Sequence, residues 1–183
     1  MPTVRATGWR SLASHWPVLL GLVAAGFQIV TGVATDAVAT TVAAAASCYL
    51  AAAAFSRPWV AWAGILSASV VVTVSEIAGV AWWAGLSAYA AALVLAGICR
   101  GAPARALAEQ AAAMLVFGGL AVVAVTISPR LGLALAGLAL ASHALWDYRH
   151  LRRADVVPSS LATFCILLDV PFGLAALTLA ALG

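Results

Sequence analysis

Charged residues are scarce in this chain. Lys, Arg, Asp and Glu together make up 8% of its 183 residues, whereas 65% of the residues are hydrophobic. An ordinary soluble domain carries about 25% charged residues and cannot hide this much apolar surface. The scarcity of charge therefore excludes a typical soluble protein and predicts an integral membrane protein that forms one domain over residues 1–183.

Lysine and asparagine are absent altogether. Without a lysine amine the chain cannot form a retinal Schiff base, which excludes a rhodopsin. It also lacks the lysine of a nucleotide-binding P-loop, so no nucleotide cofactor is expected. The three cysteines, Cys48, Cys99 and Cys165, stand singly with no CxxC spacing, and we interpret them as small hydrophobic residues of the interior.

Seven apolar segments follow one another, each near the roughly 20 residues that cross about 30 Å of hydrocarbon. They cover residues 14–34, 36–56, 58–77, 79–99, 106–127, 131–148 and 158–181. The links between them are short, so consecutive helices are expected to pack as antiparallel neighbours. We therefore predict an all-α membrane bundle of about seven transmembrane helices.

The arginines predict how this bundle is oriented. If the N-terminus is cytoplasmic, Arg130 falls outside and the eight other arginines fall inside: Arg5, Arg10, Arg57, Arg100, Arg105, Arg149, Arg152 and Arg153. This positive-inside bias predicts a cytoplasmic N-terminus and an outer C-terminus, in a cell membrane such as the bacterial inner membrane. The net charge of +3 is spread over these loops and indicates orientation rather than nucleic-acid binding.

Two imidazoles and a carboxylate gather near the end of the sixth segment: His143, Asp147 and His150. At about 100° per residue, Asp147 lies about 40° from His143 and His150 about 20° on the other side. All three therefore share one stripe of a helix. Groups that bind a metal or move a proton are costly in a membrane and usually mark a functional site. The neighbouring Trp146 and Tyr148 are also typical of an interfacial belt, which is the alternative interpretation.

Asp169 lies about 11 residues into the seventh segment, roughly 16 Å from its cytoplasmic end. A charged aspartate at that depth costs about 3 kcal/mol, so we expect it to be protonated or to face interior partners. Glu109 opens the fifth segment on the same side, where a carboxylate also complements the helix dipole. The outer half holds Asp36, Glu76 and Arg130, so the distribution of these groups favours a site that opens to the cytosol.

The pattern His143-x-x-Trp146-Asp147-x-x-His150, followed by a helix that carries Cys165 and Asp169, resembles a family of small multi-pass membrane proteins of unknown function. The resemblance covers about 30 residues at the C-terminal end. It implies a site in this part of the chain and implies no particular reaction.

These residues favour an intramembrane enzyme with a cytosol-facing site and a lipid-like or isoprenoid substrate. His143, Asp147, His150 and Glu109 offer the nitrogen and oxygen ligands that suit a divalent zinc or iron ion. In a metal-free version, a protonated Asp169 acts as the general acid and His143 as the base, with Asp147 beside them, which suits isomerisation or cyclisation.

Two other classes remain open. In a proton- or metal-ion-coupled transporter, Asp169 titrates at mid-membrane and the histidines form its cytosolic exit. In a non-catalytic scaffold, the alanine-rich faces bind partner helices, and oligomerisation is compatible with all three classes. Membrane lipids, and for the enzyme a hydrophobic small molecule, are the expected partners.

Overall fold

The computed structural model describes residues 15–183, and these residues form seven α-helices and no strand. The helices are α2 (Trp16–Thr31), α3 (Thr35–Phe55), α4 (Val60–Ile77), α5 (Trp82–Cys99), α6 (Ala104–Thr126), α7 (Pro129–Arg153) and α8 (Ser159–Leu182). Each helix coincides with one predicted apolar segment, so the all-helical prediction is confirmed. The largest difference is in α7, which continues to Arg153 and so includes His150 within its last turn.

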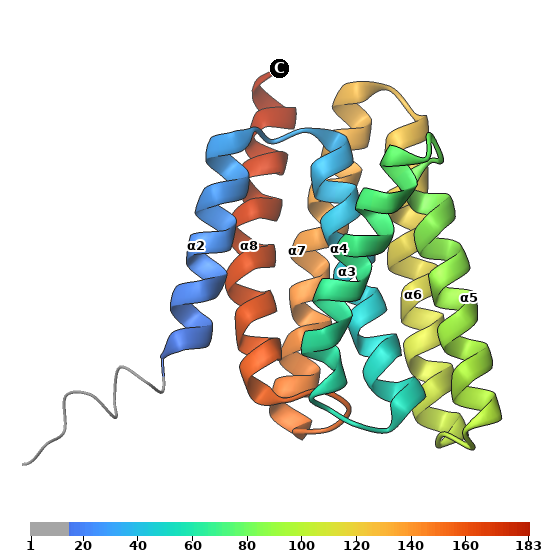
Figure 1. Cartoon of the computed structure of the whole chain (residues 1–183). Coiled ribbons are helices and arrows are strands. Elements are labelled where there is room, and N and C mark those ends of the chain that lie inside the picture. The colour runs from blue at the N-terminus through green and yellow to red at the C-terminus, as the bar shows by residue number, and fades with distance from the viewer. Residues whose placement is uncertain (1–14) are drawn as a thin grey trace, which may run out of the picture.

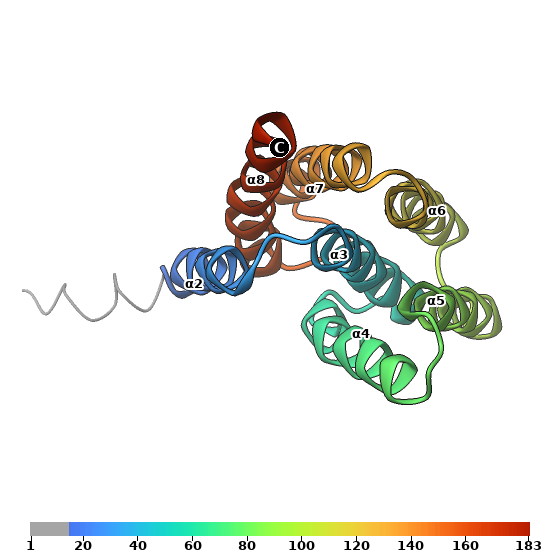
Figure 2. The ribbon, with the colours of Figure 1, turned by 90° about the horizontal axis from the view of Figure 1, so that it is seen from above.

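Helix α3 lies at the centre of the bundle, and the other helices are arranged around it (Figure 2). In the most apolar 18-residue stretch of α3, 78% of the residues are buried, whereas the same share is 22–33% in the four other long apolar helices. The reason is its composition, because alanines at 43–46 and 51–54 let neighbouring backbones approach closely. Tyr49 and Leu50 are the large side chains in this stretch, and both are fully buried.

The helices run alternately up and down, so their links collect at two ends (Figure 1). One end holds the links 56–59, 100–103 and 154–158, and we call it the arginine-rich end. It has or adjoins six of the seven described arginines: Arg57, Arg100, Arg105, Arg149, Arg152 and Arg153. The opposite end holds the links 32–34, 78–81 and 127–128, near Arg130. Arg5 and Arg10, which also entered the orientation argument, lie outside the described residues.

Five of the described helices are long and apolar enough to cross a membrane: α3, α4, α5, α6 and α8. Helix α2 is apolar but has 16 residues. Helix α7 has 25 residues but carries charged and histidine side chains over its second half. Large apolar side chains such as Val30, Ile77 and Leu182 are more than 80% exposed. An exposed apolar surface of this kind is typical of a bundle in contact with lipid.

Helices α7 and α8 form a hairpin whose backbones come into close contact through glycine. A Cβ atom built on Gly137 would lie 2.9 Å from the carbonyl oxygen of Gly173. A Cβ atom built on Gly173 would lie 2.8 Å from both the Gly137 carbonyl oxygen and the Ala141 amide nitrogen. These distances are too short for a real side chain, so the two glycines set the separation of the helices that carry His143 and Asp169.

We expect Gly173→Ala to destabilise the protein, because the added methyl group must push the two helices apart. The expected loss is about 1–3 kcal/mol, which is typical of overpacking. Gly26→Ala is the matched control, since a Cβ on Gly26 meets nothing within 4 Å and alanine favours the helix by about 1 kcal/mol. Thermal unfolding in detergent, followed by circular dichroism, measures both. Equal midpoints for the two variants would contradict the close-contact interpretation.

Candidate functional site

His143, Asp147 and Asp169 meet in a fully buried cluster, which we call the triad. Asp147 follows His143 by one helical turn on α7, and its Oδ2 lies 3.4 Å from His143 Nδ1. Asp169 comes from α8, and its Oδ2 lies 2.9 Å from the same Nδ1. His143 and Asp169 each lie ten residues from the helix ends that the 154–158 link joins. Residues at equal distances from the turn of an antiparallel hairpin face each other, which explains the pairing.

Tyr49 of the central helix completes the immediate surroundings of the triad. Its hydroxyl donates a hydrogen bond of 2.6 Å to Asp147 Oδ1. The phenol ring also contacts His143 edge-on at 5.7 Å between ring centroids, and the Phe117 ring of α6 contacts the same imidazole edge-on at 4.8 Å. Four helices therefore enclose His143, which has no exposed surface.

Three polar atoms of the triad are buried without a hydrogen-bond partner: His143 Nε2, Asp147 Oδ2 and Asp169 Oδ1. His143 Nδ1 can form one hydrogen bond, and the shorter contact, of 2.9 Å, assigns it to Asp169. Asp147 Oδ2 is consequently close to the imidazole but not bonded to it. Buried polar groups without a partner cost about 1–3 kcal/mol each, so the cluster as described is under-satisfied.

His150 lies about one helical turn beyond Asp147 on α7, toward the arginine-rich end, and it belongs to a separate hydrogen-bond network. Its Nδ1 is 2.9 Å from the Trp146 carbonyl oxygen, and its Nε2 is 3.1 Å from the Gln110 amide nitrogen. Gln110 Oε1 accepts a hydrogen bond from Trp146 Nε1, so its amide nitrogen must face His150. A carbonyl accepts and an amide nitrogen donates, which makes His150 neutral with its hydrogen on Nδ1. Neither ring nitrogen is free for a further ligand in this arrangement.

Glu109 lies outside both networks. Its two carboxylate oxygens pair with Arg105 at 3.1 Å and with Arg149 at 3.0 Å. Its side chain is 32% exposed, whereas the triad is fully buried. The structure therefore brings together His143, Asp147 and Asp169 among the predicted site residues, and gives His150 and Glu109 other partners.

The triad could hold a metal ion, because one ligand atom from each of its three residues lies within 4.8 Å of the others. Ligands of a tetrahedral zinc ion, with bonds of 2.0–2.1 Å, lie about 3.3 Å apart. The distances from His143 Nδ1 to the two carboxylates, 2.9 and 3.4 Å, bracket that value. The hydrogen bond from Tyr49 would then orient a ligating carboxylate through its second oxygen, as outer partners of metal ligands commonly do.

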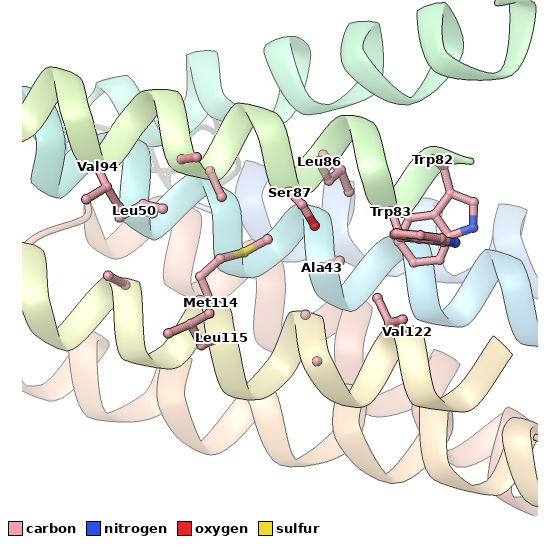
Figure 3. A pocket seen from close by; sticks show the side chains of 15 residues that line it. Ala43, Leu50, Trp82, Trp83, Leu86, Ser87, Val94, Met114, Leu115 and Val122 are labelled. Atoms are coloured by element: carbon pink, nitrogen blue, oxygen red, sulfur yellow. The ribbon is translucent and has the colours of Figure 1, made fainter. Parts of the chain in front are cut away.

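Among the cavities that residues 15–183 form, the three described below have no triad residue in their linings. The cavity in Figure 3, of about 450 Å³, lies between α3, α5 and α6 and is lined mainly by apolar side chains such as Leu86, Met114 and Val122. A charged cavity of about 460 Å³ at the arginine-rich end is lined by Arg105, Glu109, Arg153 and Asp155, among others. Gln110, Trp146 and His150 are bonded to one another and form a polar layer between the triad and the arginine-rich end.

The third cavity is a groove of about 660 Å³ between α2, α3, α4 and α8. Its lining begins at Asp36 and Glu76 near the opposite end and continues down to Cys48 and Cys165. Both thiols are buried, Cys48 immediately precedes Tyr49, and Cys165 lies one helical turn before Asp169 on α8. The groove therefore reaches the neighbourhood of the triad from the end that is poor in arginine.

Sequence reasoning did not identify Tyr49 or the groove. A signal for Tyr49 was present, because a tyrosine in an alanine-rich membrane segment has a hydroxyl that must find a partner when buried. Several polar atoms of the groove come from threonine and serine hydroxyls on α3 and α4. These side chains carry no charge, whereas the sequence analysis compared the two membrane halves by their charged side chains and histidines. Gln28 of α2 also lines the groove, and its amide donates a hydrogen bond of 3.2 Å to the Thr41 hydroxyl of α3.

Comparison of the chain with protein-family models, curated proteins and solved structures finds no match. The resemblance of the His143–Asp169 region to small multi-pass membrane proteins therefore stays a prediction. What can be said of function depends on the geometry of the triad and of the surfaces that lead to it.

We expect Tyr49→Phe to destabilise the protein by about 1–3 kcal/mol, because it leaves Asp147 Oδ1 buried without its donor. Tyr89→Phe is the matched control. The Tyr89 hydroxyl bonds Ser67, whose own oxygen also contacts the carbonyls of Ala63 and Gly64, so its removal strands no buried group. Unfolding free energies from a denaturing-detergent titration compare the two variants. Equal losses would show that the bond to Asp147 has no special importance.

Proposed function

We propose that this chain is a multi-pass membrane enzyme that holds a divalent metal ion at His143, Asp147 and Asp169 and acts on a lipid-like substrate. The observation that carries the proposal is the charge of the triad. Two carboxylates approach the same nitrogen of one imidazole, all three side chains have no exposed surface, and within residues 15–183 no arginine pairs with them.

Buried charge is costly unless it is paired. With two ionised carboxylates, the triad carries a net charge of −2 when His143 is neutral and −1 when His143 is protonated. A divalent cation bound to two carboxylates and a neutral imidazole makes the cluster neutral, and it also occupies lone pairs that otherwise have no partner. Nitrogen and oxygen ligands at this spacing suit zinc or iron. A metal ion bound there supplies the chemistry of an activated water or of a polarised substrate oxygen.

A metal-free enzyme is the alternative within the same class. If two protons are added to the state with two ionised carboxylates and a neutral His143, the net charge of the triad is also zero. Asp169 then acts as general acid and His143 as base, on an isoprenoid double bond or a related group. The contact of 2.9 Å between His143 Nδ1 and Asp169 Oδ2 is the path along which the proton moves.

A transporter is the second candidate, because it needs polar groups in both halves of the membrane. The groove supplies oxygen atoms in the arginine-poor half, where the sequence indicated few charged groups. The enzyme is favoured because the triad is covered on the arginine-rich side. There Gln110, Trp146 and His150 are bonded to one another, and Arg149 stacks over the Trp146 ring at 4.6 Å. A site that is approached from one end is typical of a reaction chamber, whereas transport requires access from both.

We also propose seven crossings with the N-terminus in the cytosol and the C-terminus outside, in a cell membrane such as the bacterial inner membrane. Support comes from the six described arginines at one end of the bundle and from the single Arg130 at the other. Helix α7 spans about 37 Å at 1.5 Å per residue, long enough to cross even though its second half is polar. His143, Asp147 and His150 of this helix are buried in the bundle interior, where membrane proteins tolerate polar groups.

Metal content tests the proposal directly. We expect the purified protein to contain close to one equivalent of zinc or iron, and His143→Gln and Asp169→Asn to lose it, because each removes one of three ligands. His150→Ala and Glu109→Gln are expected to retain the metal, since the structure gives both residues other partners. Elemental analysis of detergent-purified protein, after dialysis against a weak chelator, measures all five samples.

Two outcomes would count against the metal site. Loss of metal from His150→Ala as complete as from His143→Gln would show that the ligand set is wrong. Absence of metal from the unsubstituted protein, even after reconstitution with zinc or iron(II), would leave the metal-free acid–base version as the enzyme to test.

Reporter fusions test the topology. We expect alkaline phosphatase fused after Gly183 to be active and a fluorescent protein fused there to be dark, because the C-terminus is placed outside the cytosol. Fusions in the 100–103 link are expected to show the reverse. An active phosphatase in that link would overturn the orientation, and equal signals at both positions would show that α6, α7 and α8 do not all cross the membrane.

A further inference from the structure

The groove between α2, α3, α4 and α8 has a charged mouth. Asp36 is the second residue of α3 and Glu76 lies one residue before the end of α4, so both are at the opposite end of the bundle. Asp36 Oδ1 accepts a hydrogen bond of 3.1 Å from Trp82, and the Glu76 carboxylate has no hydrogen bond or ion pair with any described residue. The mouth therefore presents two exposed carboxylates.

No cation of the described chain neutralises this mouth. The groove has no arginine in its lining, and the arginine at this end, Arg130, donates instead to the carbonyl oxygens of Ala180 and Ala181. Two carboxylates without a counter-ion are complementary to a positively charged group on a ligand.

The body of the groove is suited to a hydrocarbon chain. Its apolar lining includes Ile65, Val72, Phe164 and Leu168, and its volume of about 660 Å³ is typical of a pocket for a small organic ligand. The hydroxyls of Thr40 and Thr73 also line it, and neither forms a hydrogen bond with another described residue. This combination of an apolar wall with a few free polar groups favours an amphiphile over a hydrated ion.

The floor of the groove adjoins the triad. Cys165 lies one helical turn before Asp169 on α8, is 3% exposed and has no hydrogen-bond partner among the described residues. Cys48 immediately precedes Tyr49, whose hydroxyl is bonded to Asp147. From Asp36 to Cys48 the groove follows α3 for about 18 Å at 1.5 Å per residue. A ligand held at the mouth by its charged head thus extends toward the candidate site.

We infer that this groove binds a single-chain amphiphile with a positively charged amine head, which lies between Asp36 and Glu76 while the chain lies along α3 toward Cys48 and Cys165. The binding follows from the groove alone. That such an amphiphile is the substrate rests on the proposed function. Such a ligand enters the groove at the arginine-poor end, whereas the sequence analysis favours a site that opens to the cytosol at the arginine-rich end.

Photo-crosslinking with dodecylamine that carries a diazirine at the end of its chain tests the inference on the full-length protein in uncharged lipid nanodiscs. We expect labelled peptides from the lower groove, around Phe164–Leu168, and competition by unlabelled dodecylamine. Dodecanol and dodecanoate are expected to compete at least tenfold less well, because they lack the positive charge that the two carboxylates attract. Equal competition by all three would overturn the amine specificity.

Two pairs of variants locate the ligand. Ser69→Trp fills the groove from α4, whereas Val70→Trp adds the same ring to a position that is 60% exposed and outside the lining. We expect the first to abolish labelling and the second to leave it unchanged. The combined change of Asp36→Asn and Glu76→Gln, both exposed and conservative, is expected to weaken dodecylamine competition about tenfold, and Asp155→Asn at the other end is the control. Labelling that both groove variants leave intact would overturn the inference.

Metal content measured in the same samples separates this inference from the proposed function. Groove variants that keep their metal but lose amine-specific labelling support the groove as a distinct binding site. Metal at the triad together with labelling that does not depend on the amine would overturn the groove inference alone. Amine-specific labelling without metal would leave the groove inference standing while the metal proposal fails.

Discussion

Two carboxylates and one imidazole, buried together in a bundle otherwise suited to lipid, impose the main constraint on this protein. Ionised groups at such depth destabilise the fold unless a proton or a cation compensates them. The constraint explains why the Tyr49 hydroxyl donates to Asp147 and why one nitrogen of His143 lies within 3.4 Å of both acids. It also explains why a neutral occupied state, with a divalent cation or with two protons, is the state in which the cluster is stable.

Close packing of small residues holds the helices of the scaffold at the separation that this cluster needs. Gly137 and Gly173 bring α7 and α8 together at the level where their acids and imidazole must meet. The alanine-rich α3 admits its neighbours from all sides and so places one large polar side chain, Tyr49, against the cluster (Figure 2). Small residues thus determine the geometry of groups that are far apart in the sequence.

The two ends of the bundle differ in what they allow. At the arginine-rich end, a bonded layer of Gln110, Trp146 and His150 lies over the triad, and the ion pairs of Glu109 lie beyond it. At the opposite end, a groove with carboxylates at its mouth and thiols at its floor leads inward. This asymmetry connects the proposed chemistry with the proposed ligand, because a charged head is held at the surface while the chain approaches the buried acids.

Hydropathy and helical periodicity were sufficient for the outline of the structure. The seven segments emerged as seven helices because roughly 20 apolar residues in succession have few other solutions in a membrane. The one-turn spacing of His143 and Asp147 put them on one face, as the contact of 3.4 Å shows. Both are properties of a single helix, so neighbouring residues determine them.

Contacts between helices were decided by the tertiary structure. His150 lies on the same stripe as His143, yet Gln110 of α6 and the Trp146 carbonyl engage its two nitrogens. Glu109 was predicted on the same side of the membrane as these residues, yet it forms ion pairs with Arg149 and Arg105 and not with the triad. The choice of Asp169 as partner of His143 and of Tyr49 as partner of Asp147, and the groove beside them, depend on which helix faces meet. Periodicity predicts a face for each helix, but packing decides which faces share a cavity.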